Sequence, residues 1–499
     1  MCRTFLIFLG MCSVPGIAFP CTRLPAGSTF WIRLNQPISS HDAKPGMPVF
    51  GFLLESAACD GVSVLPIHIP VEGRVVSVRR VGLGLVHETA NLQIEFTRIM
   101  TQAGPPINIR SRVRTIDNAR EAVKDGVIEG IRSTETPQGE ISSRLKYLPS
   151  LHLYPDPFLL GFKLLFPVFP EPEIYLPPGT DLLVELTDTV DLPEGLDRPR
   201  PTPRFGAEDE RAVEEVLNGL PTRTLDKKSH AADVINMAFV GTREQLTEGF
   251  LAAGWKESDP VSWRSVGRQF HAFLEKSSYS TAPMSQQLYG GRPPELSLEK
   301  TFDSYGRRDH LRIWKAAPAV GGEPLWVGAA VRETGATLSV TRMGFIHHVS
   351  GDPEAEQQAI QRHLLAAGCV DSVGTVERPG MERSVVNATG EVLRTDGDVM
   401  VLRFKACDAP LSSAAGSSRF RPGSKVSRYL RKEILTVRSD LLRANCIYAI
   451  YRMTAATTKT LRHMSARRAE VKSVETQSAG IDQGNPVQPF KKIEVSSTP

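Results

Sequence analysis

Hydrophobic and polar residues alternate along several short segments in the first part of the chain. The alternation is imperfect over residues 29–34 and cleaner over residues 73–78 and 91–96. Such alternation is typical of strands with one buried face, and the glycines and prolines between these segments are typical of turns. We therefore predict an all-β domain over residues 24–192, built as a barrel or a sandwich.

A weak internal repeat supports this domain. Leu-Pro-Ala-Gly-Ser at residues 24–28 and Leu-Pro-Pro-Gly-Thr at residues 176–180 each precede an extended apolar run. A glycine in this position permits the tight turn that leads into a strand. The two copies are expected to open and close the same domain.

The pattern changes after residue 232, where strand-like runs are followed by helical ones. Residues 236–241 are predicted as a strand, and Thr242 with Gln245 forms the sequence of a capping box at the start of a helix. That helix is expected to end at Leu-Ala-Ala-Gly, residues 251–254, with the glycine at the C′ position.

A second segment follows the same plan. Residues 342–347 are predicted as a strand, Asp352 precedes Pro353 as a helix N-cap, and the helix ends at a second Leu-Ala-Ala-Gly, residues 365–368. We predict an α+β domain over residues 232–408 with duplicated strand–helix units and helices on one face of its sheet. Residues 193–231, rich in Pro and charged residues, are predicted as a linker with a short helix near 208–217.

The N-terminus has the pattern of a secretory signal peptide over residues 1–18. Arg3 precedes about ten mostly apolar residues, and residues 16–18 place small side chains at a cleavage site. The expectation is an exported protein of the bacterial periplasm or cell envelope. Of the seven cysteines, Cys21 and Cys59 form either a disulfide or two buried thiols.

Charge is unevenly distributed along the chain. The net charge is +4, but residues 419–472 contain 14 Lys or Arg and 3 Asp or Glu. Within residues 424–455, apolar side chains recur at intervals of three and four, which predicts a basic amphipathic helix. Its expected contacts with an anionic membrane surface are Arg428, Arg431, Lys432, Arg438 and Arg443.

Three other interpretations of this helix remain open: packing on the protein's own core, coiled-coil pairing, and a solvated charged face. The expected partner is an anionic membrane surface or another envelope protein, and no nucleic-acid partner is expected. Residues 473–499 are polar and are predicted to be a disordered tail.

Candidate chemistry is concentrated around residues 308–312 and 347–352. His310 and His348 are candidate catalytic residues, because histidine is a common acid–base group and metal ligand. On a strand, Arg308, His310 and Arg312 share one face, so an anion-binding site is an equal alternative. His347 and His348 would point to opposite faces. No metal-ligand set, cofactor motif, phosphate-binding loop or nucleophile elbow is identified.

Residues 234–407 resemble the LssY-like C-terminal domain family. The matching segments are residues 239–244, 253–255, 282–285, 291–293, 308–314, 326–328 and 347–348. In that family the domain often follows bilayer-embedded modules, whereas a β-domain precedes it here. The resemblance implies no established catalytic chemistry.

Three functions follow as hypotheses: a non-enzymatic envelope scaffold, a peripheral membrane-binding protein, and a metal-dependent or acid–base hydrolase centred on His310 and His348. The first two are compatible with each other.

Overall fold

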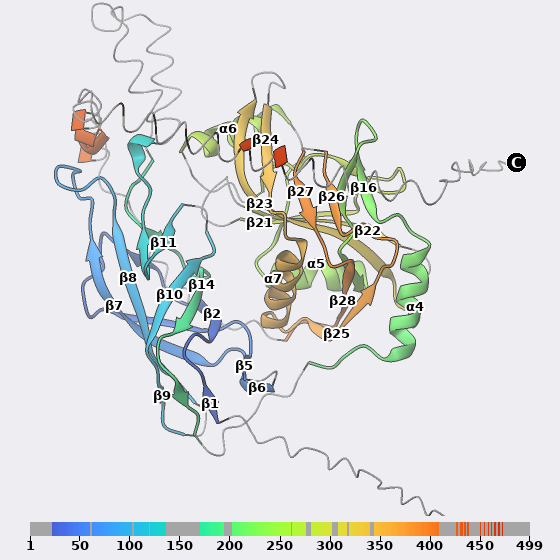
Figure 1. The fold of residues 1–499 in the computed structure, drawn as a ribbon, viewed down its shortest axis with the longest axis horizontal. Helices are drawn as coiled ribbons and strands as arrows, with labels where there is room; N and C mark the ends of the chain where they lie inside the picture. Colours follow the sequence, from blue (N-terminus) through green and yellow to red (C-terminus); the bar gives the residue numbers. More distant parts are fainter. Residues whose placement is uncertain are drawn as a thin grey trace, which may run out of the picture.

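The computed structural model places two β-rich domains side by side (Figure 1). It describes residues 22–135, 170–193 and 202–408, apart from short gaps at 60–61, 102–103, 119, 261, 276–280, 302–307, 317–318, 340–343 and 389, and scattered residues between 426 and 472. The predicted signal peptide, Cys21 and the predicted tail over 473–499 lie outside the described residues.

The first domain is a nearly closed, barrel-like sheet. Its strands run in the order β10, β14, β2, β4, β7, β8, β12 and β11, with β9 paired to β8. The bounds are β2 Thr29–Leu34, β4 Pro48–Leu53, β7 Pro70–Arg79, β8 Asn91–Ile99, β9 Ile107–Asn108, β10 Ser111–Ile116, β11 Ala122–Lys124, β12 Val127–Glu129 and β14 Asp181–Leu186. The predicted all-β fold over residues 24–192 agrees with the described part of this region.

Alternation along these strands produces the core of the first domain. In β8, Leu92, Ile94 and Phe96 are buried and the residues between them are only partly buried. Short strand pairs complete the domain: β1 Arg23–Leu24 with β15 Val190–Asp191, β3 Ile38–Ser39 with β13 Tyr175–Leu176, and β5 Ala57–Cys59 with β6 Val62–Leu65. The β1–β15 pair joins the two ends of the domain, as the Pro-x-Gly repeat predicts.

The second domain is built on a sheet in the order β19, β21, β22, β23, β18, β28 and β25, with β24 paired to β23. Only the β18–β28 pair is parallel among these strands. The bounds are β18 Met237–Val240, β19 Lys256–Glu257, β21 Leu296–Thr301, β22 Arg308–Lys315, β23 Leu325–Ser339, β24 Gly344–Val349, β25 Val370–Glu377 and β28 Asp398–Phe404.

Smaller sheets border this main sheet. One joins β17 Ala231–Val234, β16 Arg223–Asp226 and β20 Gln287–Leu288, and another pairs β26 Ser384–Val386 with β27 Val392–Arg394. A further helix, α6, spans Trp263–Glu275.

Helices cover both faces of the main sheet, which corrects the expectation of helices on one face. Helices α5 (Arg243–Ala252) and α7 (Pro353–Ala366) pack over a core that includes Phe239, Phe250 and Trp326. Helix α4 (Ala207–Asn218) packs on the opposite side, in a core that includes Val213 and Trp314. The sheet is apolar on both faces and therefore needs cover on both.

The predicted helix ends are confirmed. Thr242 and Gln245 form a complete capping box at α5, and the Asp352 carboxylate accepts a hydrogen bond from Ala355 N at 3.0 Å at the start of α7. Gly254 and Gly368 follow the two helices with φ of 88° and 70°. However, β18 lies inside the sheet, whereas in the described part of the chain β24 is paired with β23 alone, so the duplication of these strand–helix units stays a prediction.

The predicted linker needs correction because much of it belongs to the second domain. Phe205, Val213 and Leu217 are buried in its core, and Arg204 forms a parallel bridge with Val373. The Arg378 guanidinium also donates to the Leu217 carbonyl at 2.5 Å. One buried apolar side chain per helical turn is enough to anchor α4, even though its other residues are mostly charged.

A disulfide that was not predicted links Cys369, after α7, to Cys407, after β28. It ties the C-terminal end of the domain to the edge of the sheet. In the described part of the chain, no helix combines the length and apolar character needed to cross a membrane.

The two domains meet through buried charges. Arg33 of β2 holds Asp181 of β14 with two hydrogen bonds of 2.7 and 2.8 Å. Arg332 of β23 reaches Asp117 of the first domain at 3.3 Å while also contacting Asp309 at 2.8 Å. The contact between Arg332 and Asp117 crosses from one domain to the other, as do those of Lys300 and His363 with Asp181 at 4.0 and 3.4 Å.

Burial shifts the ionisation of this interface. Burial raises the pKa of Asp117 to about 6 and lowers that of Lys300 to about 7. Burial also opposes ionisation of Asp181, but the Arg33 guanidinium holds the pKa of that carboxyl well below its usual range. The interface therefore keeps Asp181 as a buried carboxylate.

Candidate functional site

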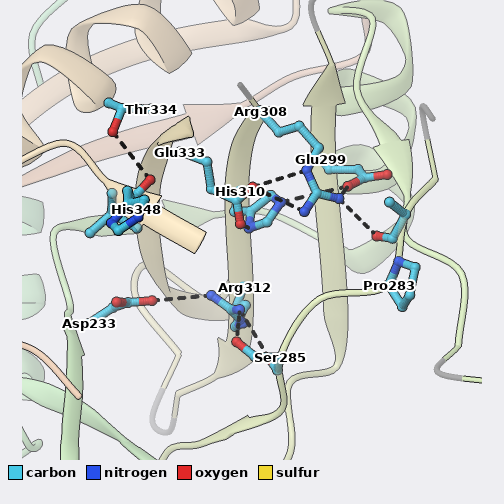
Figure 2. Close-up of polar contacts among 12 residues, drawn as sticks. Asp233, Pro283, Ser285, Glu299, Arg308, His310, Arg312, Glu333, Thr334 and His348 are labelled. Atoms are coloured by element: carbon cyan, nitrogen blue, oxygen red, sulfur yellow. Dashed lines mark hydrogen bonds and ion pairs between the residues drawn. The ribbon is translucent and has the colours of Figure 1, made fainter. Parts of the chain in front are cut away.

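The charged side chains of β22 lie on both faces of the strand. The side chains of Arg308, His310 and Arg312 lie on one face (Figure 2), while Asp309 and Leu311 lie on the other, towards α7 and the hydrophobic core. All five residues are buried. The strand alternation expected from the sequence is confirmed, and it brings three basic residues into one cleft.

Arg308 is held between two carboxylates. One of its terminal nitrogens donates to Glu299 Oε2 at 3.0 Å, and the other donates to Glu333 Oε2 at 3.0 Å. The side chain of Arg308 is fully buried. A buried guanidinium needs such partners, because an uncompensated charge in the interior is costly.

His310 lies between the same two glutamates. Its Nδ1 is 3.2 Å from Glu333 Oε1, and its Nε2 is 3.7 Å from Glu299 Oε2. Burial raises the pKa of Glu299 to about 8, although the neighbouring Arg308 opposes the shift. The imidazole is thus flanked by one orienting carboxylate and by one carboxyl group that titrates near neutral pH.

Arg312 forms the other end of the cleft. Its guanidinium donates to Asp233 Oδ2 at 3.2 Å and to the carbonyl and hydroxyl of Ser285 at 3.0 and 3.1 Å. Gln287 donates to the same Asp233 oxygen at 2.6 Å. Arg312 is therefore fixed in position by the loop before β20 and by β17.

A cavity of about 270 Å³ opens onto these groups. Arg308, His310, Arg312 and Glu333 line it together with Asn387. A larger depression of about 1000 Å³ adjoins it and shares Arg312, Ser285 and Asp226 with it. The volumes suit a small polar molecule in the inner chamber.

His348 does not join this cleft. Its Nδ1 donates to Glu391 Oε1 at 2.8 Å, and in Figure 2 it lies beside Thr334 at a distance from His310. In the sheet register His310 pairs with Val331, whereas His348 pairs with Gly335, farther along the same strand. The expectation of one site centred on both histidines is therefore corrected, while the side chain of His347 lies outside what the structure describes.

Residues 217–399 match the LssY C-terminus family. This match confirms the resemblance found in the sequence, and the region is called the LssY-like domain below. The cleft residues on β22 and the histidine on β24 lie inside the matched region.

No curated protein matches the chain. ComB10 of the Com type IV secretion system of Helicobacter pylori is similar over 34% of this chain and 91% of its own, at 13% identity and a TM-score of 0.20. That score is too low to support an argument about fold or function.

Three carboxylates of the LssY-like cleft were missed by the sequence analysis. Glu299 and Glu333 come from the strands on either side of β22, and Asp233 comes from β17. The only available signal was the alternation in those strands, which places Glu299 and Glu333 on the same face as His310. Alternation shows which residues of a strand share a face, but not which strands are neighbours in the sheet. The sequence pattern alone therefore could not bring these carboxylates next to His310.

The basic segment near residue 430 contacts the first domain through Arg431 and Leu435. Arg431 donates to the Gly82 carbonyl at 2.5 Å and pairs with Glu171, and Leu435 packs on Gly84. Arg431 is buried, contrary to the expectation of a lipid headgroup contact. Lys432 and Arg438 are half-buried, and Arg428 and Arg443 lie outside the described residues.

Apolar side chains are exposed on and beside this segment. Val426, Leu430 and Val437 are exposed by 68%, 48% and 50%. Three apolar residues of the β7–β8 loop that the segment contacts are exposed as well: Leu83, Leu85 and Val86. These six residues are called the apolar patch below.

Proposed function

We propose that this protein is an exported, non-enzymatic protein of the bacterial cell envelope that binds an anionic membrane surface peripherally. One observation carries the proposal: the apolar patch is formed by two segments distant in sequence that contact each other, and its side chains are exposed. Large apolar side chains exposed near one another often mark a site for a protein or membrane partner.

The charges around the patch favour a membrane as that partner. Lys432 and Arg438 are half-buried residues of the same segment, and residues 419–472 carry a large excess of basic residues. Apolar insertion together with basic residues at the surface is the usual mode of peripheral binding to anionic lipid. The signal-like N-terminus and the Cys369–Cys407 disulfide support export, since disulfides persist in oxidising compartments.

Buried domain contacts support the scaffold part of the proposal. The charge network between Arg33, Asp181, Asp117 and Arg332 joins the β-domain to the LssY-like domain. The patch lies on the β-domain side, so a fixed arrangement would hold the LssY-like cleft in a defined orientation at the membrane. We also interpret β18–α5 and β24–α7 as a duplicated unit, because both helices end in Leu-Ala-Ala-Gly.

Co-sedimentation with vesicles tests the proposal. The chain without residues 1–18 should sediment with phosphatidylglycerol–phosphatidylcholine vesicles, and much less with phosphatidylcholine alone. A Leu85→Asn, Val86→Asn double variant should bind about tenfold more weakly, because it removes two exposed apolar side chains. Leu251→Asn, an exposed leucine on α5, is the matched control and should bind as the unmodified chain does.

Two results would contradict membrane binding through the patch. One is equal sedimentation with both kinds of vesicle. The other is unchanged binding by the double variant.

Acid–base hydrolysis is the second candidate function, centred on His310 without His348. The pairing of His310 with Glu333, next to a carboxyl group with a pKa of about 8, favours it. Turnover of p-nitrophenyl acetate or p-nitrophenyl phosphate should then disappear in His310→Gln and persist in His41→Gln, which alters an exposed histidine. Equal rates in both variants would exclude this role for His310.

A further inference from the structure

A second group of titratable side chains lies at the domain interface, away from the cleft. Among the residues that the structure describes, Asp117, Asp181 and His363 are the one group placed to share a metal ion, with one ligand atom from each within 4.8 Å of the others. Asp117 and Asp181 belong to the β-domain. His363 belongs to α7 of the LssY-like domain.

The backbone sets these positions. The Asp117 amide donates to the Asp181 carbonyl at 2.9 Å, which holds the two aspartates together at adjacent ends of β10 and β14. His363 lies on the face of α7 that meets this end of the barrel, and its Nε2 is 3.4 Å from Asp181 Oδ2. Two rigid elements of one domain and a helix of the other therefore converge on one point.

Burial distinguishes this group from ordinary acidic clusters. His363 is 0% exposed, and the Asp117 and Asp181 side chains are 8% and 2% exposed. Among the described residues, Asp117 Oδ2 and His363 Nδ1 have no hydrogen-bond partner, and His363 Nε2 has only the 3.4 Å contact with Asp181 Oδ2. Buried polar atoms are nearly always satisfied, so the unpaired Asp117 Oδ2 and the loosely paired His363 Nε2 beside it indicate a missing ligand.

The surrounding charge is compatible with a cation. Three basic side chains, Arg33, Lys300 and Arg332, face four carboxylates in this interface: Asp117, Asp181, Asp309 and Glu356. Lys300 Nζ lies 4.0 Å from Asp181, farther than Arg33, and is the group that an incoming cation would displace.

We propose that Asp117, Asp181 and His363 form a divalent-metal site that takes Zn²⁺ and joins the two domains. One imidazole and two carboxylates are ligands that zinc accepts, with water completing a four-coordinate shell. The site is enclosed, and its ligands come from both domains. Its role is therefore structural: the ion links α7 to the end of the barrel.

Zinc binding by the untagged full chain tests the proposal. After dialysis against EDTA, the chain should take up one Zn²⁺, and Co²⁺ in its place should give the visible absorption of a low-coordinate site. His363→Gln should weaken zinc binding by about 100-fold or more, since even the loss of an outer-shell group costs 10–100-fold. His68→Gln is the matched control, because His68 is also an interface histidine but donates to the Ala366 carbonyl at 2.7 Å.

A measurement on the unmodified chain guards against a variant that fails to fold. Crystals grown with Zn²⁺ should show an anomalous scattering peak between Asp117, Asp181 and His363. Absence of bound metal in the unmodified chain, an anomalous peak elsewhere, or full zinc uptake by folded His363→Gln would overturn the proposal.

Discussion

At the scale of single residues, the LssY-like cleft depends on how protons are distributed among Glu299, His310 and Glu333. These side chains form one buried group with Arg308, so removing one partner leaves another charge uncompensated. The stability of the cleft is therefore expected to depend on pH, mainly through the raised pKa of Glu299.

Glu299 should make the protein less stable as pH rises through the neutral range. Its pKa is raised to about 8 in the folded protein, so the folded state binds more protons than the unfolded state between about pH 4.5 and 8. The free energy of unfolding then falls with pH over this window. Glu299→Gln mimics the protonated form and should remove this fall, which amounts to up to about 4 kcal/mol.

Urea unfolding of both proteins between pH 5 and 8 measures this difference. Glu257→Gln, at an exposed position, is the control. A constant difference in unfolding free energy between the unmodified chain and Glu299→Gln across this range would show that Glu299 does not titrate as described.

At the scale of elements, the disulfide between Cys369 and Cys407 fastens the end of α7 to the end of β28. It closes a loop of 38 residues, for which chain entropy predicts a stabilisation of about 4 kcal/mol. A double Cys369→Ser, Cys407→Ser variant should therefore unfold at a markedly lower temperature in calorimetry. If reducing agent lowers the melting temperature of this variant as much as that of the unmodified chain, the stabilisation comes from elsewhere.

The sequence predicts the structure well at positions whose contacts lie within a few residues along the chain. The capping box at Thr242, the N-cap at Asp352 and the glycines after both helices are fixed by contacts within one helical turn. The two faces of β22 follow equally from strand alternation. None of these predictions needed the position of a distant segment.

Features that depend on distant partners were not predictable in this way. Arg312 meets Asp233 across 79 residues and Arg332 meets Asp117 across the domain boundary, and no spacing rule links such pairs. The same reason explains the missed disulfide. Helix α4 was read as part of a linker because its composition is mostly charged, while the few apolar residues that anchor it have their partners elsewhere in the domain.

At the scale of the whole molecule, the two domains behave as one body through their buried contacts. Arg362 of α7 stacks over Trp31 with its guanidinium carbon 4.5 Å from the ring centre, beside the network around Asp181. A protease site inserted at residues 194–200 should therefore give two fragments that co-elute in size-exclusion chromatography. Fragments that separate at physiological ionic strength would show that the interface does not hold without the connecting chain.

The central claim is that the apolar patch contacts an anionic membrane. Hydrogen–deuterium exchange of the full chain, with and without phosphatidylglycerol-containing vesicles, tests it most directly because it requires no substitution. We predict slower exchange over residues 82–86 and 426–438 in the presence of vesicles, and no change over α5. Unchanged exchange in these two segments, or protection confined to the LssY-like domain, would contradict the account.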